Sequence, residues 1–255
     1  MAELEQLGGV AQTEVIVIPM IDVSGSMCGE KIGKVNEAMA EVPSQLADIN
    51  DEAIESKLLI APMEFSSGAR WFSLKNNQPA EVESFRWIDM KANGLTDLGA
   101  AFKLLTEKLT TEEKGGWMKG RGGAAPVIIL ISDGGPTDDY QSQLKVLKQR
   151  GWFNAALKFA VAVGDDADKS VLAEFTGNQE AVIETEVIRT DLASIVKAVI
   201  VSASKTASKS ASVSNSGNVS AEVQESGPEI NAQAQQEAIA GVQKALTMDD
   251  SDDLF

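Results

Sequence analysis

The sequence EVIVIPMIDVSGS, residues 14–26, carries the clearest structural signal in the chain. Its first part, residues 14–21, is rich in β-branched and other apolar residues and predicts a strand. The five residues that follow place oxygen-bearing side chains at every second position: Asp22, Ser24 and Ser26. In a turn that leaves a strand, this spacing can direct one carboxylate and two hydroxyls at one point.

Strands and helices alternate through most of the chain. The run PVIILI, residues 126–131, is short and continuously apolar, which is typical of a strand covered on both faces. Residues 57–65 and 69–74 predict a hairpin around a Ser-Ser-Gly turn. The other predicted strands are residues 157–163 and 181–184, and the predicted helices are residues 30–49, 96–109, 138–149, 168–175 and 191–202. This order predicts an α/β fold, a doubly wound, mostly parallel sheet with one antiparallel edge strand and helices on both faces.

The composition changes near residue 202 and divides the chain into three predicted segments. Residues 1–202 hold the long apolar runs and all aromatic residues except Phe255, so they form the predicted domain. Residues 203–228 are rich in Ser and Ala, which predicts a disordered linker. Residues 229–255 predict a short helix followed by an acidic tail that ends in MDDSDDLF.

The charge and the missing residue types exclude several functions. With 38 acidic against 22 basic side chains, the formal net charge is −16, which argues against binding to nucleic acid or to anionic lipid. The absence of His excludes Ser-His-Asp and Cys-His nucleophiles and any zinc site with His ligands. A single Cys excludes an internal disulfide. No secretory signal and no apolar stretch of about 18 residues is visible, so we expect a cytoplasmic protein without membrane contact.

Two further loops add oxygen ligands to those of the first. Sheets of this kind bind ligands at the carboxyl ends of their strands. Asp133 follows the predicted strand at residues 126–131, and Thr96 lies in a loop, at the start of a predicted helix. Together the three loops offer two carboxylates and three hydroxyls, which are hard ligands that suit Mg²⁺, Mn²⁺ or Ca²⁺. A cation held by so few charges would accept one more carboxylate from another molecule.

This three-part pattern resembles the metal-ion-dependent adhesion site of von Willebrand factor A (VWA) domains. The resemblance implies that Ser24, Ser26 and Thr96 ligate the metal directly, and that Asp22 and Asp133 act directly or through water. It implies a non-enzymatic interaction module in which Mg²⁺ binds an Asp or Glu of a protein partner. The doubly wound sheet of the VWA family agrees with the order of predicted strands and helices.

The resemblance to VWA domains covers about residues 12–202, and part of it is narrower. Four stretches resemble the small VWA proteins of bacterial tellurite-resistance gene clusters, the Y-type proteins: IDVSGSMCGEKIGKVNEAM, TTEEKGGWMKG, LISDGGPTDDY and VSASKTASKSAS. This narrower resemblance implies a stress-response or metal-sensing system in which a protein kinase and a phosphatase are partners.

Other functions stay open on the sequence alone. A magnesium-dependent phosphohydrolase could use Asp22 as its nucleophile, but aspartyl phosphatases of the haloacid-dehalogenase type need a second Asp where this chain has Ser24. A structural or phage-associated protein could use the same fold. The acidic tail could itself supply the missing carboxylate, from Asp249, Asp250, Asp252 or Asp253.

Several conspicuous residues have structural explanations. Asp97, Asp138 and Asp139 are predicted near helix N-termini, where acidic side chains cap the free N–H groups. We expect Cys28 to be a small, half-buried residue and the four Trp side chains to serve packing.

Overall fold

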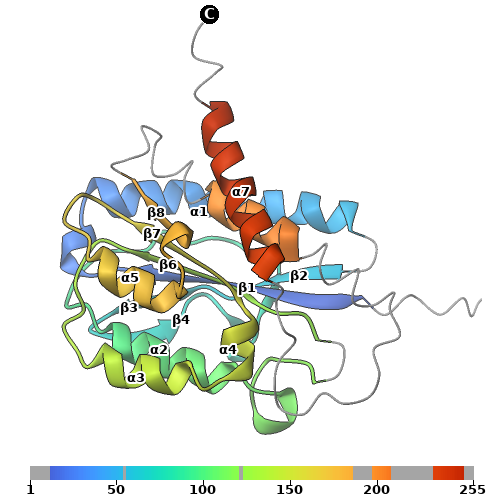
Figure 1. Ribbon diagram of the computed structural model, residues 1–255, viewed down its shortest axis with the longest axis horizontal. Helices are drawn as coiled ribbons and strands as arrows, with labels where there is room; N and C mark the ends of the chain where they lie inside the picture. Colours follow the sequence, from blue (N-terminus) through green and yellow to red (C-terminus); the bar gives the residue numbers. More distant parts are fainter. Residues whose placement is uncertain (1–11, 54–55, 121–122, 186–196, 208–231, 250–255) are drawn as a thin grey trace, which may run out of the picture.

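The computed structural model describes residues 12–53, 56–120, 123–185, 197–207 and 232–249, which build one sheet between two layers of helices (Figure 1). The strands are β1 (Thr13–Asp22), β2 (Ser56–Ile60), β3 (Met63–Ser66), β4 (Gly68–Trp71), β5 (Ala80–Glu81), β6 (Val127–Ser132), β7 (Leu157–Ala162) and β8 (Val182–Glu184). The helices are α1 (Glu30–Glu52), α2 (Leu98–Lys108), α3 (Tyr140–Leu147), α4 (Gly151–Ala155), α5 (Lys169–Thr176), a helix over residues 197–207, and α7 (Ala232–Asp249). This architecture confirms the predicted α/β fold.

β1 lies at the centre of the sheet, whose main strand order is β4-β3-β1-β6-β7-β8. On one side it pairs in parallel with β6, and on the other side with β2 along its first half and β3 along its second half. The predicted single strand over residues 57–65 is therefore wrong, because the ladder is interrupted at Ala61 and Pro62. Proline has no backbone N–H to donate to a neighbouring strand. The carbonyl of Pro62 accepts a hydrogen bond from Phe72 N at 2.8 Å, outside the strand pairings.

Antiparallel pairing occurs at the margin of the sheet. β4 runs antiparallel to β3 and forms the edge of the main strand order, as the hairpin prediction requires. The two-residue strand β5 also pairs antiparallel, with β2, and the sequence gives no sign of it. All pairings among β1, β6, β7 and β8 are parallel, so the carboxyl ends of these strands share one edge.

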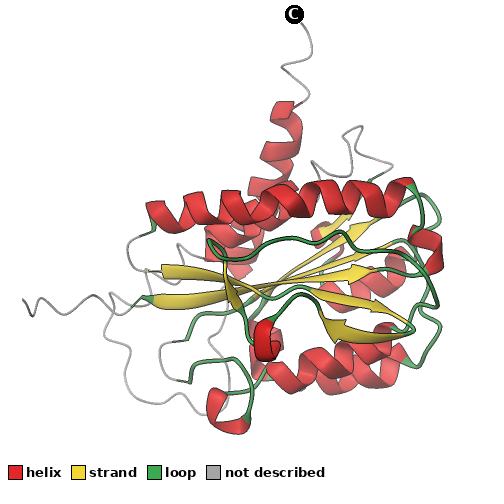
Figure 2. Ribbon diagram, turned by 180° about the vertical axis from the view of Figure 1, so that it is seen from behind, coloured by secondary structure: helices red, strands yellow, loops and turns green. Residues whose placement is uncertain are grey.

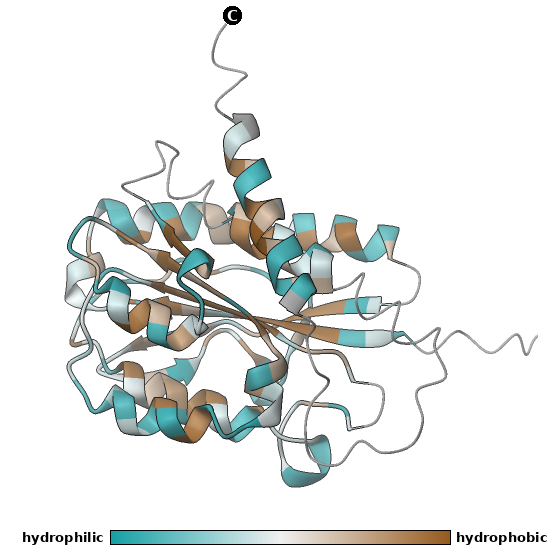
Figure 3. Ribbon diagram, viewed as in Figure 1, coloured by the Kyte–Doolittle hydropathy of each residue, from teal (hydrophilic) through white to brown (hydrophobic). Residues whose placement is uncertain are grey.

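Helices cover both faces of the sheet (Figure 2), and the core has two parts, one between the sheet and each layer of helices. Alternate residues of a strand point to opposite faces. Val15 and Val17 of β1 pack with α1, α7 and the helix over 197–207, whereas Ile16 and Ile18 pack with the layer of α2 to α5. This burial on both faces explains the continuous apolar runs, which stand out as brown strands in the interior (Figure 3).

α2 and α3 both begin two residues later than predicted, at Leu98 and Tyr140. Asp97 and Asp139 occupy the N-cap positions, and their backbones are not helical. Because α2 starts late, Thr96 stays in the loop and its side chain is free to face the end of the sheet.

The chain beyond residue 196 also packs on the domain. Residues 197–207 are helical, so this helix continues into the stretch whose composition predicts a linker, while residues 191–196 of the predicted helix lie outside the described residues. α7 packs on the same layer through four buried side chains: Ala238, Ile239, Val242 and Leu246. The acidic tail, residues 250–255, lies outside the described residues. In the described part of the chain, no helix has both the length and the apolar character that crossing a membrane requires.

Candidate metal centre

Three loops meet at the carboxyl edge of the sheet: the loop after β1, the loop after β6 and the loop before α2. Backbone hydrogen bonds join them, since Gly25 N donates to Gly94 O at 3.0 Å and Thr137 N donates to Thr96 O at 2.8 Å. Gly94 has a φ of +93°, and a Cβ there would lie 2.7 Å from Ser67 Oγ. Only glycine permits this contact with the turn between β3 and β4 without strain. The two backbone hydrogen bonds hold the three loops relative to one another.

Asp22, the last residue of β1, is fully buried. Its Oδ1 accepts from Ser24 N at 2.8 Å, and its Oδ2 accepts from the Ser132 hydroxyl at 2.6 Å. Burial raises the pKa of Asp22, although the hydrogen bonds from Ser132 and Ser24 act in the opposite direction. A cation close to this carboxyl would favour its charged form.

Asp133 follows β6 directly and is also buried. Ser26 Oγ donates to Asp133 Oδ1 at 2.7 Å, and the hydroxyls of Ser24 and Ser26 are 2.9 Å apart. A Cβ on Gly134 would lie 3.5 Å from Ser26 Oγ and 3.9 Å from Thr96 Oγ1. The structure therefore brings all five predicted side chains together: Asp22, Ser24, Ser26, Thr96 and Asp133. Among these five, Ser26 alone is exposed, so the group opens to solvent on its side.

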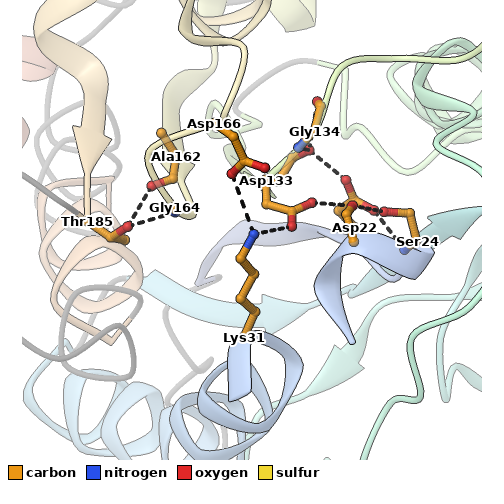
Figure 4. A network of polar contacts seen from close by, with 11 residues as sticks. Asp22, Ser24, Lys31, Asp133, Gly134, Ala162, Gly164, Asp166 and Thr185 are labelled. Carbon is orange, nitrogen blue, oxygen red and sulfur yellow. Dashed lines mark hydrogen bonds and ion pairs between the residues drawn. The ribbon is translucent and has the colours of Figure 1, made fainter. Parts of the chain in front are cut away.

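Two residues of this network escaped the sequence analysis, Ser132 and Lys31. The Lys31 ammonium lies 2.5 Å from Asp133 Oδ2 and 3.6 Å from Asp166 Oδ1 (Figure 4). Burial lowers the pKa of Lys31, but the two carboxylates outweigh it and hold the pKa above its ordinary value. Lys31 is therefore positively charged at neutral pH. A basic residue in the first turn of a helix interacts unfavourably with the helix dipole. The position of Lys31 was therefore a signal in the sequence that its side chain has a compensating contact.

The neighbouring acidic residues have structural roles. Asp97 accepts from Gly68 N at 2.8 Å and from the Thr137 hydroxyl at 3.2 Å, which ties the β3–β4 turn to the site. Asp138 caps α2, because its two carboxylate oxygens accept from Gly99 N and Ala100 N. Asp139 caps its own helix, α3, by accepting from Ser142 N.

The structure contradicts the prediction for Cys28 and confirms the prediction for Trp117. Cys28 is exposed, so the prediction of a half-buried side chain is wrong, although its thiol donates to Ala92 O at 3.1 Å. Trp117 is buried against Trp71, with ring centroids 4.2 Å apart, and its indole N–H donates to Asn77 O. Trp117 therefore serves packing, as predicted.

The donor set fits a hard divalent cation. Its members are two carboxylates and three hydroxyls, all oxygen, which is the chemistry that Mg²⁺, Mn²⁺ and Ca²⁺ prefer. Within the described ranges, no cluster of three or more His, Cys, Asp or Glu side chains could hold a metal. A metal at this edge of the sheet must therefore use hydroxyls and water for most of its shell.

Comparison with known proteins places the chain in a family. The model of the von Willebrand factor type A domain matches residues 16–198, so the chain belongs to the VWA family, whose members generally bind protein partners through a metal ion. No curated protein matches the chain in sequence.

Solved structures share the fold at low sequence identity. A von Willebrand factor type A protein from Catenulispora acidiphila is 15% identical, with a TM-score of 0.53, and the match covers 77% of this chain and 43% of that one. The ArnB paralog VWA2 from Sulfolobus acidocaldarius is 18% identical, with a TM-score of 0.51 and coverage of 75% and 45%. Proximal thread matrix protein 1 from the mussel byssus, in a structure with a zinc-occupied MIDAS motif, is 16% identical, with a TM-score of 0.52 and coverage of 74% and 47%. The chain thus spans less than half the length of these three proteins.

Proposed function

We propose that this protein is a non-enzymatic interaction module that holds a divalent metal and binds a carboxylate of a protein partner. Ser24, Ser26 and Thr96 ligate the metal, and Asp22 and Asp133 balance its charge directly or through water. The observation that carries the proposal is the convergence of these five side chains from three loops, with both carboxylates buried. An Asp or Glu of the partner completes the shell on the exposed side, next to Ser26.

Mg²⁺ is the proposed metal, with Mn²⁺ and Ca²⁺ as the closest alternatives. Mg²⁺ keeps several waters and needs few protein carboxylates, which matches a donor set with only two. The zinc-occupied motif of the mussel protein makes Zn²⁺ a necessary comparison in any titration.

An apolar residue beside the metal adds a contact for the partner. Leu95 immediately precedes Thr96, and 57% of its surface is exposed. Its backbone N–H donates to Ser67 Oγ at 3.1 Å, which holds the loop in place. We propose that the partner covers Leu95 when its carboxylate reaches the metal, because burial of a Leu side chain contributes about 2 kcal/mol.

The geometry of Asp22 weighs against the phosphohydrolase alternative. A nucleophilic carboxylate needs an oxygen that attacks phosphorus directly, whereas both oxygens of Asp22 accept hydrogen bonds, from Ser24 N and the Ser132 hydroxyl. Balancing the charge of a metal needs no such attack, since it can act through a water. The carboxylate is also fully buried. We therefore propose no catalytic residue.

The cellular setting is a further proposal that rests on the narrower sequence resemblance. The Y-type VWA proteins of tellurite-resistance clusters suggest a cytoplasmic stress-response system, with a protein kinase and a phosphatase as candidate partners. Tagged wild-type protein should retain its partner in Mg²⁺ and lose it in EDTA, and identification of the retained protein tests this setting.

Metal binding itself is tested by titrating the wild-type protein and Asp22→Ala with Mg²⁺, Mn²⁺, Ca²⁺ and Zn²⁺ in a calorimeter. We expect the wild type to bind and Asp22→Ala to show no binding, while circular dichroism shows an intact fold. Asp48→Ala is the matched control, since Asp48 is an exposed acid on α1. Equal binding by the wild type and Asp22→Ala would overturn the proposal.

A further inference from the structure

Lys31 introduces a positive charge into the candidate metal centre. Its ammonium lies 2.5 Å from Asp133 Oδ2 and 3.6 Å from Asp166 Oδ1, between the loops that follow β6 and β7 (Figure 4). Lys31 belongs to the first turn of α1, where the helix dipole disfavours a cation. The contact with Asp133 compensates for that position.

The surroundings of Lys31 leave room for this contact. Gly164 has a φ of +89°, and a Cβ there would lie 3.2 Å from Lys31 Nζ and 3.0 Å from Asp166 Oδ1. Any larger residue would crowd both ends of the ion pair. The Asp133 side chain is fully buried, and its second oxygen accepts from Ser26. The ammonium therefore lies between two segments of the chain, the loops after β6 and β7, with 31% of the Lys31 side chain exposed.

Lys31 changes the charge that a metal and a partner meet. Asp22 and Asp133 contribute two buried negative charges, and Lys31 cancels one of them. The charge of Asp166, the second partner of Lys31, is screened by water because 69% of that side chain is exposed. A divalent cation then leaves the centre with one positive charge, which a single carboxylate of a partner neutralises. Without Lys31, the metal-loaded centre would be neutral before the partner bound, and the partner's carboxylate would add an unbalanced charge.

We infer that Lys31 sets the ligand preference of the centre, weakening its affinity for the cation and strengthening the affinity of the loaded centre for a carboxylate. This inference rests on the proposed function, because it requires a cation at these five side chains. It predicts opposite changes in two affinities: removing the charge of Lys31 should strengthen the binding of the cation and weaken the binding of a carboxylate by the loaded centre. A lysine that only stabilised the fold would not separate the two affinities in this way.

The test compares Lys31→Met, Lys31→Arg and Lys34→Met with the wild type. Lys34 lies on the same helix and pairs with Glu37, so its substitution removes an equal charge away from Asp133. Free Mn²⁺, measured by electron paramagnetic resonance, gives the cation affinity. Broadening of the acetate methyl proton signal by the Mn²⁺-loaded protein, compared at equal metal occupancy, gives the carboxylate affinity.

We expect Lys31→Met to bind Mn²⁺ about tenfold more tightly or better and to broaden acetate less, because a unit charge acts strongly in a partly buried site. Lys31→Arg and Lys34→Met should stay within about twofold of the wild type, since both leave a positive charge beside Asp133. In EDTA, Lys31→Met should melt below Lys34→Met, because the buried Asp133 carboxylate then lacks a counter-charge and keeps only the hydrogen bond from Ser26.

Two results would overturn the inference. If the wild type binds Mn²⁺ and Lys31→Met binds it no more tightly, or broadens acetate equally, Lys31 does not set the preference, although the metal centre itself stands. If neither protein binds Mn²⁺, the proposed function fails and the role of Lys31 fails with it.

Discussion

The Ser132 hydroxyl donates to Asp22 Oδ2 at 2.6 Å, across the two central strands of the sheet. Asp22 ends β1 and Ser132 ends β6, so the parallel pairing of these strands places the two side chains at the same edge. Ser24 N holds the other oxygen of Asp22. The carboxylate is thus oriented before any metal binds, which lowers the cost of ordering it.

We predict that Ser132→Ala weakens metal binding without abolishing it. Groups that orient metal ligands change the affinity about 10- to 100-fold when they are removed. Calorimetric titration with Mg²⁺ or Mn²⁺ would measure the change. Ser44→Ala is the control, because Ser44 lies exposed on α1 and bonds only to the carbonyl of Glu41 among described groups. Unchanged affinity in Ser132→Ala would show that Asp22 needs no such support.

A second prediction separates partner binding from metal binding. Leu95→Ser should leave the Mn²⁺ affinity within about twofold of the wild type, because the side chain is exposed and donates nothing to the metal. It should release the partner more readily from immobilised protein, since it removes apolar surface beside the metal. Val146→Ser is the matched control, an exposed apolar residue on α3. Equal retention by both variants would place the partner elsewhere.

The fold was predictable because each of its main strands is marked by a local sequence pattern, a run of apolar residues. The runs that became β1, β6 and β7 are mostly apolar, with few polar residues to break the run, and this pattern is typical of strands that are buried on both faces. The interruption between β2 and β3 also had a local signal, Pro62, which the prediction of one continuous strand did not use.

The convergence of the five proposed ligand side chains was predictable because each stands at the end of a predicted strand or beside a predicted helix. The contacts of Lys31 and Gln235 were not predictable, because no pattern in the sequence pairs either residue with its partner. Lys31 meets Asp133, 102 residues away, and Gln235 meets Lys158, 77 residues away. Amphipathic spacing shows that α1 and α7 have buried faces, but it does not show which groups those faces reach.

A third prediction concerns pH. Asp168 caps α5, and the hydroxyl of Ser170 and the backbone N–H groups of Ser170 and Val171 hold the pKa of Asp168 below its ordinary value. Between the folded and unfolded pKa values the folded protein binds fewer protons, so this stabilisation is present above about pH 4 and is lost as the pH falls further. Asp168→Ala should cost about 1 kcal/mol at pH 7 and less at pH 3.

Urea unfolding of the wild type, Asp168→Ala and Asp168→Asn across pH 3 to 7 would measure this effect. Asn also caps helices but does not titrate, so the stability of Asp168→Asn should stay near that of the wild type at pH 7. The gap between Asp168→Asn and Asp168→Ala should then be independent of pH. A wild-type advantage over Asp168→Ala that does not shrink in acid would contradict the assigned cap.

The last prediction is that α7 is part of the folded domain. Gln235 Oε1 accepts from Lys158 N at 3.2 Å, and its Nε2 donates to Lys158 O at 3.0 Å, so a side-chain amide pairs with β7 as a neighbouring strand would. β8 pairs with β7 only from Ala160 onward, which leaves the backbone of Lys158 available to Gln235. Ile239 and Val242 are buried against the same layer.

Ile239→Ala should therefore lower the free energy of unfolding by about 2–4 kcal/mol, the usual cost of truncating a buried Ile. Gln243→Ala is the control, because Gln243 is exposed on the same helix and Ala favours helix formation. Urea unfolding would give the free energies, and amide exchange at Lys158 would report whether Gln235 stays paired. If Ile239→Ala unfolds like the wild type, α7 is only loosely attached, and the composition-based prediction of a separate C-terminal segment describes residues 229–255 better than the packing does.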